Sequence, residues 1–341
     1  MGFKVVHTLA VPGKDLAEGV LQDLDVELVK GLWQTEDELI AECADADAVI
    51  GDIARKPFTR RVMEQWRHCR ILAGVNLGYD AMDLAAATDS TIVVTNVPDY
   101  CLDEVSGRAI ALIMALGYKI VQANSAVKTE QRSMAPNMNV MLEVISPVHR
   151  MRGQTLGIIG CSKIGTATAL KAKGLGLRVI AYDPFVFGGV LESLGIEPTD
   201  METLLKESDF VSLHVPATPE TKNLLGYEQL SQMKRTAYVI NTSRGSVIDE
   251  PGLIEALQAG LIAGAGLDVT ALEPIEKDNP LINMPNVILT GHSGWYSQEA
   301  EAELFYKPML QVAMALKGRW PTFATNPLVK ERWLEKWATN D

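Results

Sequence analysis

The sequence has little cysteine and no excess of positive charge. Only 4 of 341 residues are cysteine (Cys43, Cys69, Cys101 and Cys161), and no two of them have CxxC spacing. We therefore expect reduced thiols, with neither a disulfide framework nor a metal site. Against 31 Lys and Arg stand 43 Asp and Glu, a formal net charge of −12. A nucleic acid is not an expected partner, because phosphate binding needs basic residues in excess.

Long apolar runs are also missing. None reaches the roughly 18–20 residues that a membrane-spanning helix needs, so no membrane is expected as a partner. The first 16 residues carry no convincing cleavage site, and we interpret them as a first strand and not as a signal peptide. A cytoplasmic location is the resulting prediction. The length of 341 residues is sufficient for two domains, each with its own core.

Short apolar runs alternate with longer helical patterns along the chain. The predicted strands are 4–10, 47–53, 70–76, 91–97, 155–160, 178–183, 210–215, 237–243, 263–269 and 286–291. Buried runs rich in Val and Ile, separated by helices, are typical of parallel sheets covered on both faces. We expect an α/β protein with two Rossmann-like or flavodoxin-like doubly wound parallel-sheet domains and a cleft between them.

Two long helical stretches, 104–121 and 298–318, are predicted to carry the chain from one domain to the other. Residues 104–296 would form an NAD-binding Rossmann domain. Residues 1–103 and 297–341 would together form a substrate domain.

A glycine-rich turn is predicted between the strand 155–160 and a helix. Gly160 permits a tight turn, and Gly165 lets the helix pack closely on the strand, as in a G-x-G-x-x-G nucleotide motif. Ser162 stands at the middle glycine, where its small hydroxyl is compatible with a pyrophosphate. Lys163 and Ile164 complete the turn.

Asp183 lies eighteen residues beyond Gly165, at the end of the next predicted strand. A carboxylate there accepts the ribose hydroxyls of NAD and repels the 2′-phosphate of NADP. We therefore predict NAD as the cofactor. The alternative is that Asp183 only begins a turn before Pro184.

Three later strand ends each supply one chemically capable side chain: Arg244, Glu273 and His292. Ligands of open parallel sheets bind at the carboxyl ends of the strands, so the three can meet at one site. Taken singly, each residue also fits an ordinary structural or surface role.

Seven stretches resemble one family. They are VPDYCLDEV, RGQTLGIIGCSKIG, YDP, DFVSLHVPATPETKNLL, NTSRGSVIDEPGLIEAL, AGAGLDVTALEP and GHSGWYS. The chain is similar to the D-isomer-specific 2-hydroxyacid dehydrogenases from about residue 45 to about residue 326. GHSGWYS most resembles the branch of the C-terminal-binding-protein corepressors. The resemblance implies two Rossmann-like domains around a cleft and a homodimer.

By position, the resemblance implies that His292 is the acid/base for a 2-oxo/2-hydroxy acid and that Glu273 holds its imidazole. Arg244 would bind the substrate carboxylate and carbonyl oxygen, and the backbone amides of Leu77 and Gly78 would complete the carboxylate site. Further cofactor contacts are implied at Pro216, Thr221, Thr242, Arg244, Asp268 and His292.

Trp295 matches a residue that lines the substrate pocket, and we expect it to favour a side chain larger than methyl. The methionines Met134, Met138 and Met141 would either add adaptable apolar surface there or pack in an ordinary core.

The chain departs from the family pattern at several positions. They are Asn76 for glycine, Ala81 for asparagine, Gly107-Arg108 for Glu-His, Ser162 for glycine and Gly291 for proline. Because Arg244, Glu273 and His292 are retained, we expect retained catalysis with an altered pocket.

The predicted function is NAD-dependent interconversion of a 2-oxo acid and a D-2-hydroxy acid. The alternatives are an NAD(H)-sensing dimeric scaffold of corepressor type and a phosphoglycerate or hydroxypyruvate dehydrogenase. The resemblance leaves the substrate and the physiological direction open.

Overall fold

The structure is a computed structural model that describes residues 2–9, 16–135 and 137–339. The chain forms two compact units, and we describe each by itself. Unit 1 comprises residues 1–100 and 297–341, and unit 2 comprises residues 101–296. The chain thus passes from one unit to the other at two places.

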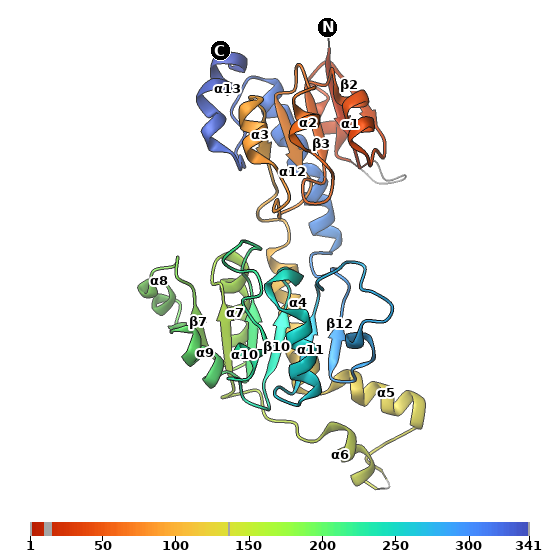
Figure 1. Cartoon of the computed structure of the whole chain (residues 1–341), viewed down its shortest axis with the longest axis vertical. Helices are drawn as coiled ribbons and strands as arrows, with labels where there is room; N and C mark the ends of the chain where they lie inside the picture. The colour runs from red at the N-terminus through yellow and green to blue at the C-terminus, as the bar shows by residue number, and fades with distance from the viewer. Residues whose placement is uncertain (1, 10–15, 136, 340–341) are drawn as a thin grey trace. The chain divides into compact units, whose positions relative to one another are not determined.

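Unit 1 contains a five-stranded parallel sheet in the order β2-β1-β3-β4-β5 (Figure 1). Its strands are β1 (Phe3–His7), β2 (Val26–Lys30), β3 (Ala48–Gly51), β4 (Ile71–Gly74) and β5 (Val93–Thr95). Strands β3 and β4 are buried throughout. This is the flavodoxin-like strand order, in which the loops after β3, β4 and β5 share one edge of the sheet.

Helices of unit 1 come from both ends of the chain. The α-helices are α1 (Glu36–Cys43), α2 (Arg60–Met63), α3 (Leu84–Asp89), α12 (Gln298–Leu316) and α13 (Lys330–Trp337). The 3₁₀ helices are η1 (Glu18–Leu21) and η4 (Pro327–Val329). The fully buried Trp333 of α13 donates a hydrogen bond to the Arg70 carbonyl, and so fixes the carboxyl-terminal segment to the start of β4.

Unit 2 contains a seven-stranded parallel sheet in the order β12-β11-β10-β9-β6-β7-β8. Its strands are β6 (Thr155–Ile159), β7 (Arg178–Tyr182), β8 (Glu197–Pro198), β9 (Phe210–Leu213), β10 (Tyr238–Asn241), β11 (Gly264–Leu267) and β12 (Val287–Leu289). The strand order reverses between β6 and β9. In open α/β sheets such a switch point, at the carboxyl ends of the strands, is where nucleotides bind.

Helices cover both faces of this sheet. They are α4 (Leu102–Gly117), α5 (Ile120–Glu130), α6 (Asn139–Ile145), α7 (Lys163–Gly174), α8 (Gly188–Ser193), α9 (Met201–Glu207), α10 (Tyr227–Leu230) and α11 (Glu250–Gln258). The 3₁₀ helices are η2 (Gly245–Val247) and η3 (Pro280–Asn283).

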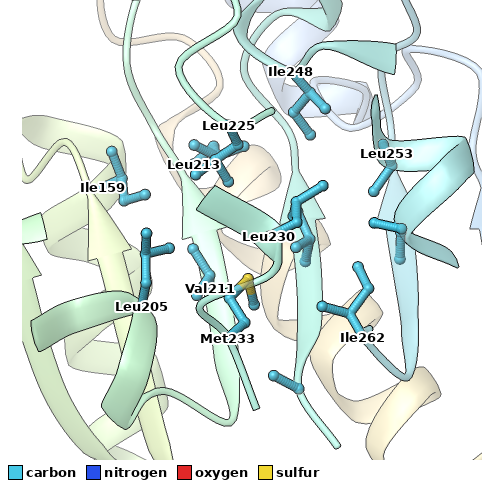
Figure 2. Packing of buried hydrophobic residues seen from close by; sticks show 14 of the residues in the cluster. Ile159, Leu205, Val211, Leu213, Leu225, Leu230, Met233, Ile248, Leu253 and Ile262 are labelled. Atoms are coloured by element: carbon cyan, nitrogen blue, oxygen red, sulfur yellow. The ribbon is translucent and has the colours of Figure 1, made fainter. Parts of the chain in front are cut away.

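Alternate side chains of the unit 2 strands, except the exposed edge strand β8, enter two separate cores. In β9, Val211 and Leu213 pack with α9, α10 and α11, as Figure 2 shows for their cluster, whereas Phe210 faces α4 and α7. This alternation follows from the twofold side-chain period of a strand. Since both faces are apolar, the inner strands are almost continuous hydrophobic runs.

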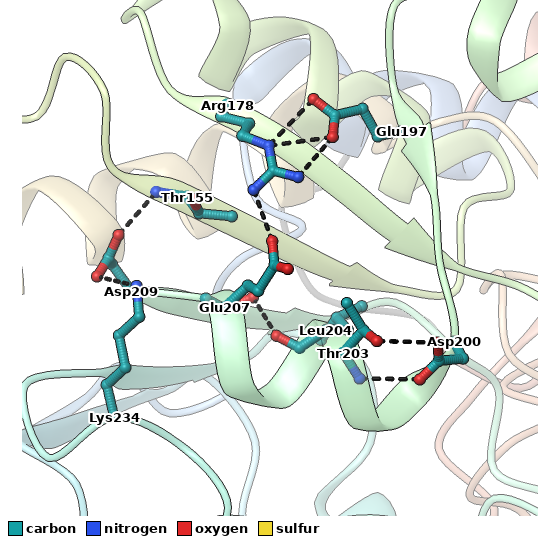
Figure 3. Close-up of polar contacts among 10 residues, drawn as sticks. Thr155, Arg178, Glu197, Asp200, Thr203, Leu204, Glu207, Asp209 and Lys234 are labelled. Atoms are coloured by element: carbon teal, nitrogen blue, oxygen red, sulfur yellow. Dashed lines mark hydrogen bonds and ion pairs between the residues drawn. The ribbon is translucent and has the colours of Figure 1, made fainter.

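Polar contacts hold the amino-terminal edge of the unit 2 sheet (Figure 3). Asp209 accepts hydrogen bonds from Thr155 N–H and from the Lys234 ammonium, both at 2.8 Å. Arg178 binds Glu197 and Glu207. These charged groups lie at the edge opposite to the candidate active site, where they tie neighbouring strand ends together.

The predicted α/β fold with two doubly wound parallel sheets is confirmed. Every predicted strand coincides with an observed one, although residue 10 of the first lies outside the described residues. Strands β2 and β8 were not predicted. Both are edge strands; β2 carries the exposed Glu27 and Lys30 and so lacks a buried run, and β8 has two residues.

Within the described ranges, no single helix is long and apolar enough to cross a membrane. Helices α4 and α5 pass that test only when taken together, and they are bent by 57°.

Candidate active site

The glycine turn lies between β6 and α7, at the switch point of the unit 2 sheet. Gly160 has φ +86°, and a Cβ atom there would lie 2.7 Å from the His214 carbonyl oxygen beyond β9. A Cβ atom on Gly165 would lie 2.0 Å from the Gly160 carbonyl oxygen. Both positions therefore exclude a side chain. The motif requires glycine at these positions for the tight turn and for the close packing of the helix on the strand.

Ser162 is the N-cap residue of α7, and Lys163 and Ile164 begin the helix. The first intrahelical hydrogen bond runs from Thr166 N–H to the Ser162 carbonyl at 2.9 Å. The N–H groups of residues 163–165 therefore stay at the positive end of the helix dipole. Such a helix end is suited to a pyrophosphate. The Ser162 side chain makes no capping hydrogen bond, so its hydroxyl does not compete for these donors.

Asp183 follows β7, and backbone groups use both of its carboxylate oxygens. Oδ2 accepts Cys161 N–H at 2.7 Å, which ties β7 to the glycine turn. Oδ1 accepts Phe185 N–H at 2.9 Å and closes a turn over Pro184. Because each carboxylate oxygen has a further lone pair, these bonds leave room for ribose hydroxyls.

The loop after β9 closes on itself beside the glycine turn. The Thr221 hydroxyl donates to the Pro216 carbonyl at 2.6 Å. Val215, the residue before Pro216, would be 2.6 Å from a Cβ atom on Gly160. Pro216 and Thr221 thus lie in a loop that reaches the glycine turn.

The Arg244 loop follows β10 and packs against the loop after β11. Asn241, almost fully buried, donates to the Arg244 carbonyl at 2.9 Å, and the Arg244 guanidinium donates to the Ser243 carbonyl at 2.8 Å. A Cβ atom on Gly245 would lie 1.9 Å from the Thr270 carbonyl oxygen. The arginine backbone therefore lies against the segment that leads to Glu273.

Glu273 and His292 are in direct contact. Oε2 of Glu273 lies 2.6 Å from Nδ1 of His292, and both side chains are about one third exposed. Among the described residues no group binds Nε2 of His292. A carboxylate on one ring nitrogen fixes the orientation of an imidazole and leaves the other nitrogen for a proton transfer.

Two consecutive left-handed residues carry the imidazole. Gly291 has φ +60° and His292 has φ +57°. The proline usual before this histidine cannot adopt a positive φ, because its ring holds φ near −65°. Gly291 therefore fits a backbone that the proline would prevent.

Asp268 organises the loop that contains His292. Its carboxylate, 4% exposed, accepts the Thr290 hydroxyl at 2.5 Å, Ser293 N–H at 3.1 Å and Gly294 N–H at 3.0 Å. Its backbone carbonyl accepts His292 N–H at 2.5 Å. Asp268 thus has a supporting role in addition to the cofactor contact implied by the resemblance.

Arg108, one of the departures, supports the same loop. Its guanidinium donates to the Ser293 carbonyl at 3.4 Å, and its side chain flanks Gly294 together with Asp268. Nothing in the sequence indicated that this arginine contacts the histidine loop.

Leu77 and Gly78 lie in unit 1, in the loop that follows β4. Their backbone N–H groups donate no hydrogen bond within the described residues. Two adjacent free amides of this kind can bind an anion.

The residues at the switch point fit a dinucleotide. The Thr242 hydroxyl, buried at the end of β10, has no hydrogen-bond partner among the described residues. The glycine turn at Gly160 and Gly165 and the free N–H groups of α7 offer donors for a pyrophosphate. The Thr242 hydroxyl offers one more polar group, suited to a carboxamide.

Comparisons with known proteins decide the family. The NAD binding domain of the D-isomer specific 2-hydroxyacid dehydrogenases matches residues 110–294. This chain belongs to that family. It is an NAD(P)-dependent 2-hydroxyacid dehydrogenase, an oxidoreductase acting on a CH–OH group.

Three relatives show how far the similarity extends. A glyoxylate reductase of Korarchaeum cryptofilum is 38% identical over 296 residues, 85% of this chain and 87% of that protein. A D-3-phosphoglycerate dehydrogenase of Methanocaldococcus jannaschii is 36% identical over 86% of this chain, which corresponds to 54% of that protein. The solved D-mandelate dehydrogenase of Rhodotorula graminis has a TM-score of 0.83 and 27% identity, covering 94% of this chain and 98% of that one.

The prediction of a corepressor-type branch is corrected. The relatives that match over most of this chain include glyoxylate reductases and D-3-phosphoglycerate dehydrogenases. GHSGWYS misled the assignment, because a short stretch beside the histidine says little about the rest of the chain.

Trp295 lies in the histidine loop of the dehydrogenase, partly buried and edge-to-face with Tyr296 at a centroid distance of 5.5 Å. Met134 and Met138 are exposed on the segment that joins α5 to α6. That segment lies at the amino-terminal edge of the sheet (Figure 1), where Val144 and Pro147 line a hollow with Phe210. Within unit 2, these methionines therefore lie away from His292.

His214 is a site neighbour that the sequence analysis did not single out. It is 8% exposed, its Nε2 lies 2.9 Å from the Ser212 hydroxyl, and its Nδ1 has no partner among the described residues. Burial lowers its pKa to about 4. In the sequence it stood inside the predicted strand 210–215, and only the observed end of β9 at Leu213 places it directly after a strand.

We expect this histidine to make the protein less stable in acid. Its pKa falls from 6.5 when unfolded to about 4 when folded, so stability present above pH 6.5 is lost as the pH falls toward 4. At pH 5, which is 1.5 units below the unfolded-state pKa, the free energy of unfolding should therefore be about 2 kcal/mol lower than above pH 6.5. Urea unfolding measures the fall in the free energy of unfolding between pH 7 and pH 5. This fall should be about 2 kcal/mol smaller in His214→Gln than in wild type. The exposed His149→Gln should behave as wild type; an equal loss in all three proteins would contradict the assignment.

Proposed function

We propose that this dehydrogenase interconverts a 2-oxo acid and a D-2-hydroxy acid with NAD(H). The bound dinucleotide supplies or accepts the hydride. His292 donates a proton from Nε2 to the substrate oxygen during reduction and takes it back during oxidation. The 2.6 Å contact between its Nδ1 and Glu273 carries this assignment, because it holds the ring with Nε2 free.

In this proposal, Glu273 orients the imidazole through its contact with Nδ1. Arg244 binds the substrate carboxylate and polarises the carbonyl oxygen, since a planar guanidinium matches a pair of oxygens. The Leu77 and Gly78 amides contribute to carboxylate binding.

Glyoxylate and hydroxypyruvate are the substrates that we favour, because a glyoxylate reductase is 38% identical over most of the chain. The loop position of Trp295 and the structural similarity to a D-mandelate dehydrogenase favour larger apolar 2-oxo acids as a second candidate. A phosphoglycerate activity has the support of the Methanocaldococcus relative.

Oxidation of NADH, followed by absorbance with a panel of 2-oxo acids, tests the proposal. The panel contains glyoxylate, hydroxypyruvate, pyruvate and phenylglyoxylate, with 3-phosphoglycerate and NAD in the reverse direction. The highest kcat/KM is expected for glyoxylate or hydroxypyruvate. A preference for phenylglyoxylate would favour the second candidate. NADH binding without any turnover would contradict the enzyme proposal and favour a sensing scaffold.

We propose NAD over NADP because of the Asp183 carboxylate at the end of β7. Asp183→Asn removes the charge that repels a 2′-phosphate, so the ratio of the NADP and NAD values of kcat/KM should rise about tenfold. Glu192→Gln removes an exposed charge on α8 and should leave the ratio unchanged. A wild type that uses both cofactors equally would refute the preference.

We also propose a homodimer in the cytoplasm. Large apolar side chains are exposed on the segment from the end of α4 to the start of unit 2's first strand: Tyr118, Ile120, Val121, Val127, Met134, Met138 and Val148. Several large apolar side chains exposed on one segment are typical of a protein interface. Light scattering should give about twice 37.2 kDa; a mass of one chain would refute it.

A further inference from the structure

The loop after β4 presents two backbone amides, and asparagine side chains fix their direction. We infer that Asn76 and Asn96 are positioning residues that hold the Leu77 and Gly78 N–H groups ready for a carboxylate. This inference rests on the proposed function, in which those amides help to bind the substrate. Asn76 is one of the positions where the chain departs from the family pattern.

The first amide is oriented through the carbonyl of the same peptide unit. The Asn76 carbonyl accepts Val97 N–H, beyond β5, at 3.0 Å. In a planar trans peptide the C=O and N–H bonds point in opposite directions. The Leu77 N–H therefore points away from Val97, whose side chain is buried.

The second amide is oriented by a side chain. Nδ2 of Asn96 donates to the Leu77 carbonyl at 2.7 Å, and Asn96 is only 9% exposed. By the same geometry the Gly78 N–H points away from Asn96. Both amides thus point away from the segment 96–97, which makes them neighbours on one side of the loop.

The Asn76 side chain fixes the next peptide unit and joins it to the loop after β3. Nδ2 donates to the Gly78 carbonyl at 2.8 Å and to Oδ1 of Asp52 at 3.2 Å. Oδ1 accepts Ile53 N–H at 3.2 Å. Because both acceptors face Nδ2 and the donor faces Oδ1, the amide has one consistent orientation.

Asp52 makes that anchor rigid. Its Oδ1 also accepts the N–H groups of Ala54 and Arg55, at 2.9 and 3.1 Å. The asparagine thus connects two adjacent loop ends of the sheet, which follow β3 and β4. A glycine at position 76 would leave the Gly78 carbonyl and the Ile53 N–H without these bonds.

The pre-oriented amides favour binding because their ordering cost is met during folding, before the substrate arrives. The contact with a carboxylate is the same in the ground state and the transition state. Loss of the orientation should therefore raise KM and leave kcat unchanged.

The test compares Asn96→Ala, Asn76→Ala and Asn76→Gly with wild type. For the preferred 2-oxo acid we expect KM to rise about tenfold in each variant, as for one lost hydrogen bond to a charged group. We expect kcat, the Kd of NADH and Tm to stay close to wild type. Gln65→Ala, which removes an exposed amide from the turn after α2 in the same unit, should change none of these values.

Asn76→Gly is the sharpest variant, because it installs the residue usual in the family. An unchanged KM in all three variants would overturn the inference. A parallel fall of kcat, NADH affinity and Tm would also overturn it, since that pattern indicates general loss of folding.

Calorimetric binding of oxamate to the enzyme–NADH complex separates this inference from the proposed function. Absence of 2-oxo acid turnover in wild type contradicts the proposed function alone. About tenfold weaker oxamate binding in the asparagine variants supports the positioning role without requiring turnover. Equal binding in wild type and variants, or none in wild type, overturns it.

Discussion

Replacement of His292 by asparagine is expected to lower kcat about 10³-fold, because the group that transfers the proton is lost. The Kd of NADH should change much less than kcat, since His292 is one of several implied cofactor contacts and the glycine turn and α7 are untouched. Asparagine is the better replacement because it tolerates the left-handed backbone at φ +57°, where alanine is strained. Stopped-flow or steady-state NADH oxidation with glyoxylate or hydroxypyruvate measures the effect.

Two comparisons make the His292 result specific. Glu273→Gln keeps an oxygen that accepts from Nδ1 but removes the charge, so a smaller loss of about tenfold in kcat is expected. His149→Asn alters an exposed histidine of the same unit and should have no effect. A kcat within threefold of wild type in His292→Asn would exclude this side chain as the acid/base.

The second large effect is expected from Arg244→Lys, which keeps the charge and removes the planar fork. We expect kcat/KM for the 2-oxo acid to fall about 10²–10³-fold, as for the loss of an oxyanion donor. The lysine ammonium cannot bind the carboxylate and the carbonyl oxygen together. The backbone of the loop should persist, because the bond from Asn241 involves only the Arg244 carbonyl.

Arg235→Lys is the matched control for this substitution. It makes the same chemical change at an exposed arginine at the amino-terminal edge of the same sheet, and it should leave kcat/KM unchanged. Thermal unfolding of both variants should follow wild type. Nearly full activity in Arg244→Lys would mean that any positive charge suffices, and the proposed bidentate contact would be wrong.

Sequence reasoning was most successful where the signal is local. The strands of both sheets are short apolar runs, and burial on both faces leaves that pattern in the sequence itself. The turn glycines were predictable for a similar reason. Backbone atoms within or beside the turn leave no room for a side chain at Gly160 or Gly165. Edge strands β2 and β8 were missed because an edge needs no buried run.

The supporting contacts of the site were beyond the reach of the sequence. The resemblance implies a cofactor contact for Asp268, and it gave no sign that the carboxylate also holds the histidine loop 22 to 26 residues away. Asn76 stood out only as a missing glycine, and its partner Asp52 lies 24 residues earlier. Neither pairing leaves a periodic or compositional pattern.

The amino-acid sequence alone determined the α/β class, the nucleotide turn and the set of strand ends that carry Arg244, Glu273 and His292. These properties depend on burial and backbone conformation, which neighbouring residues specify. Only the tertiary structure decided which side chains support the candidate site, with Asp268 and Arg108 at the histidine loop and Asn76 and Asn96 at the amide pair. Those contacts depend on the order of strands in each sheet, which brings together loops that are far apart along the chain.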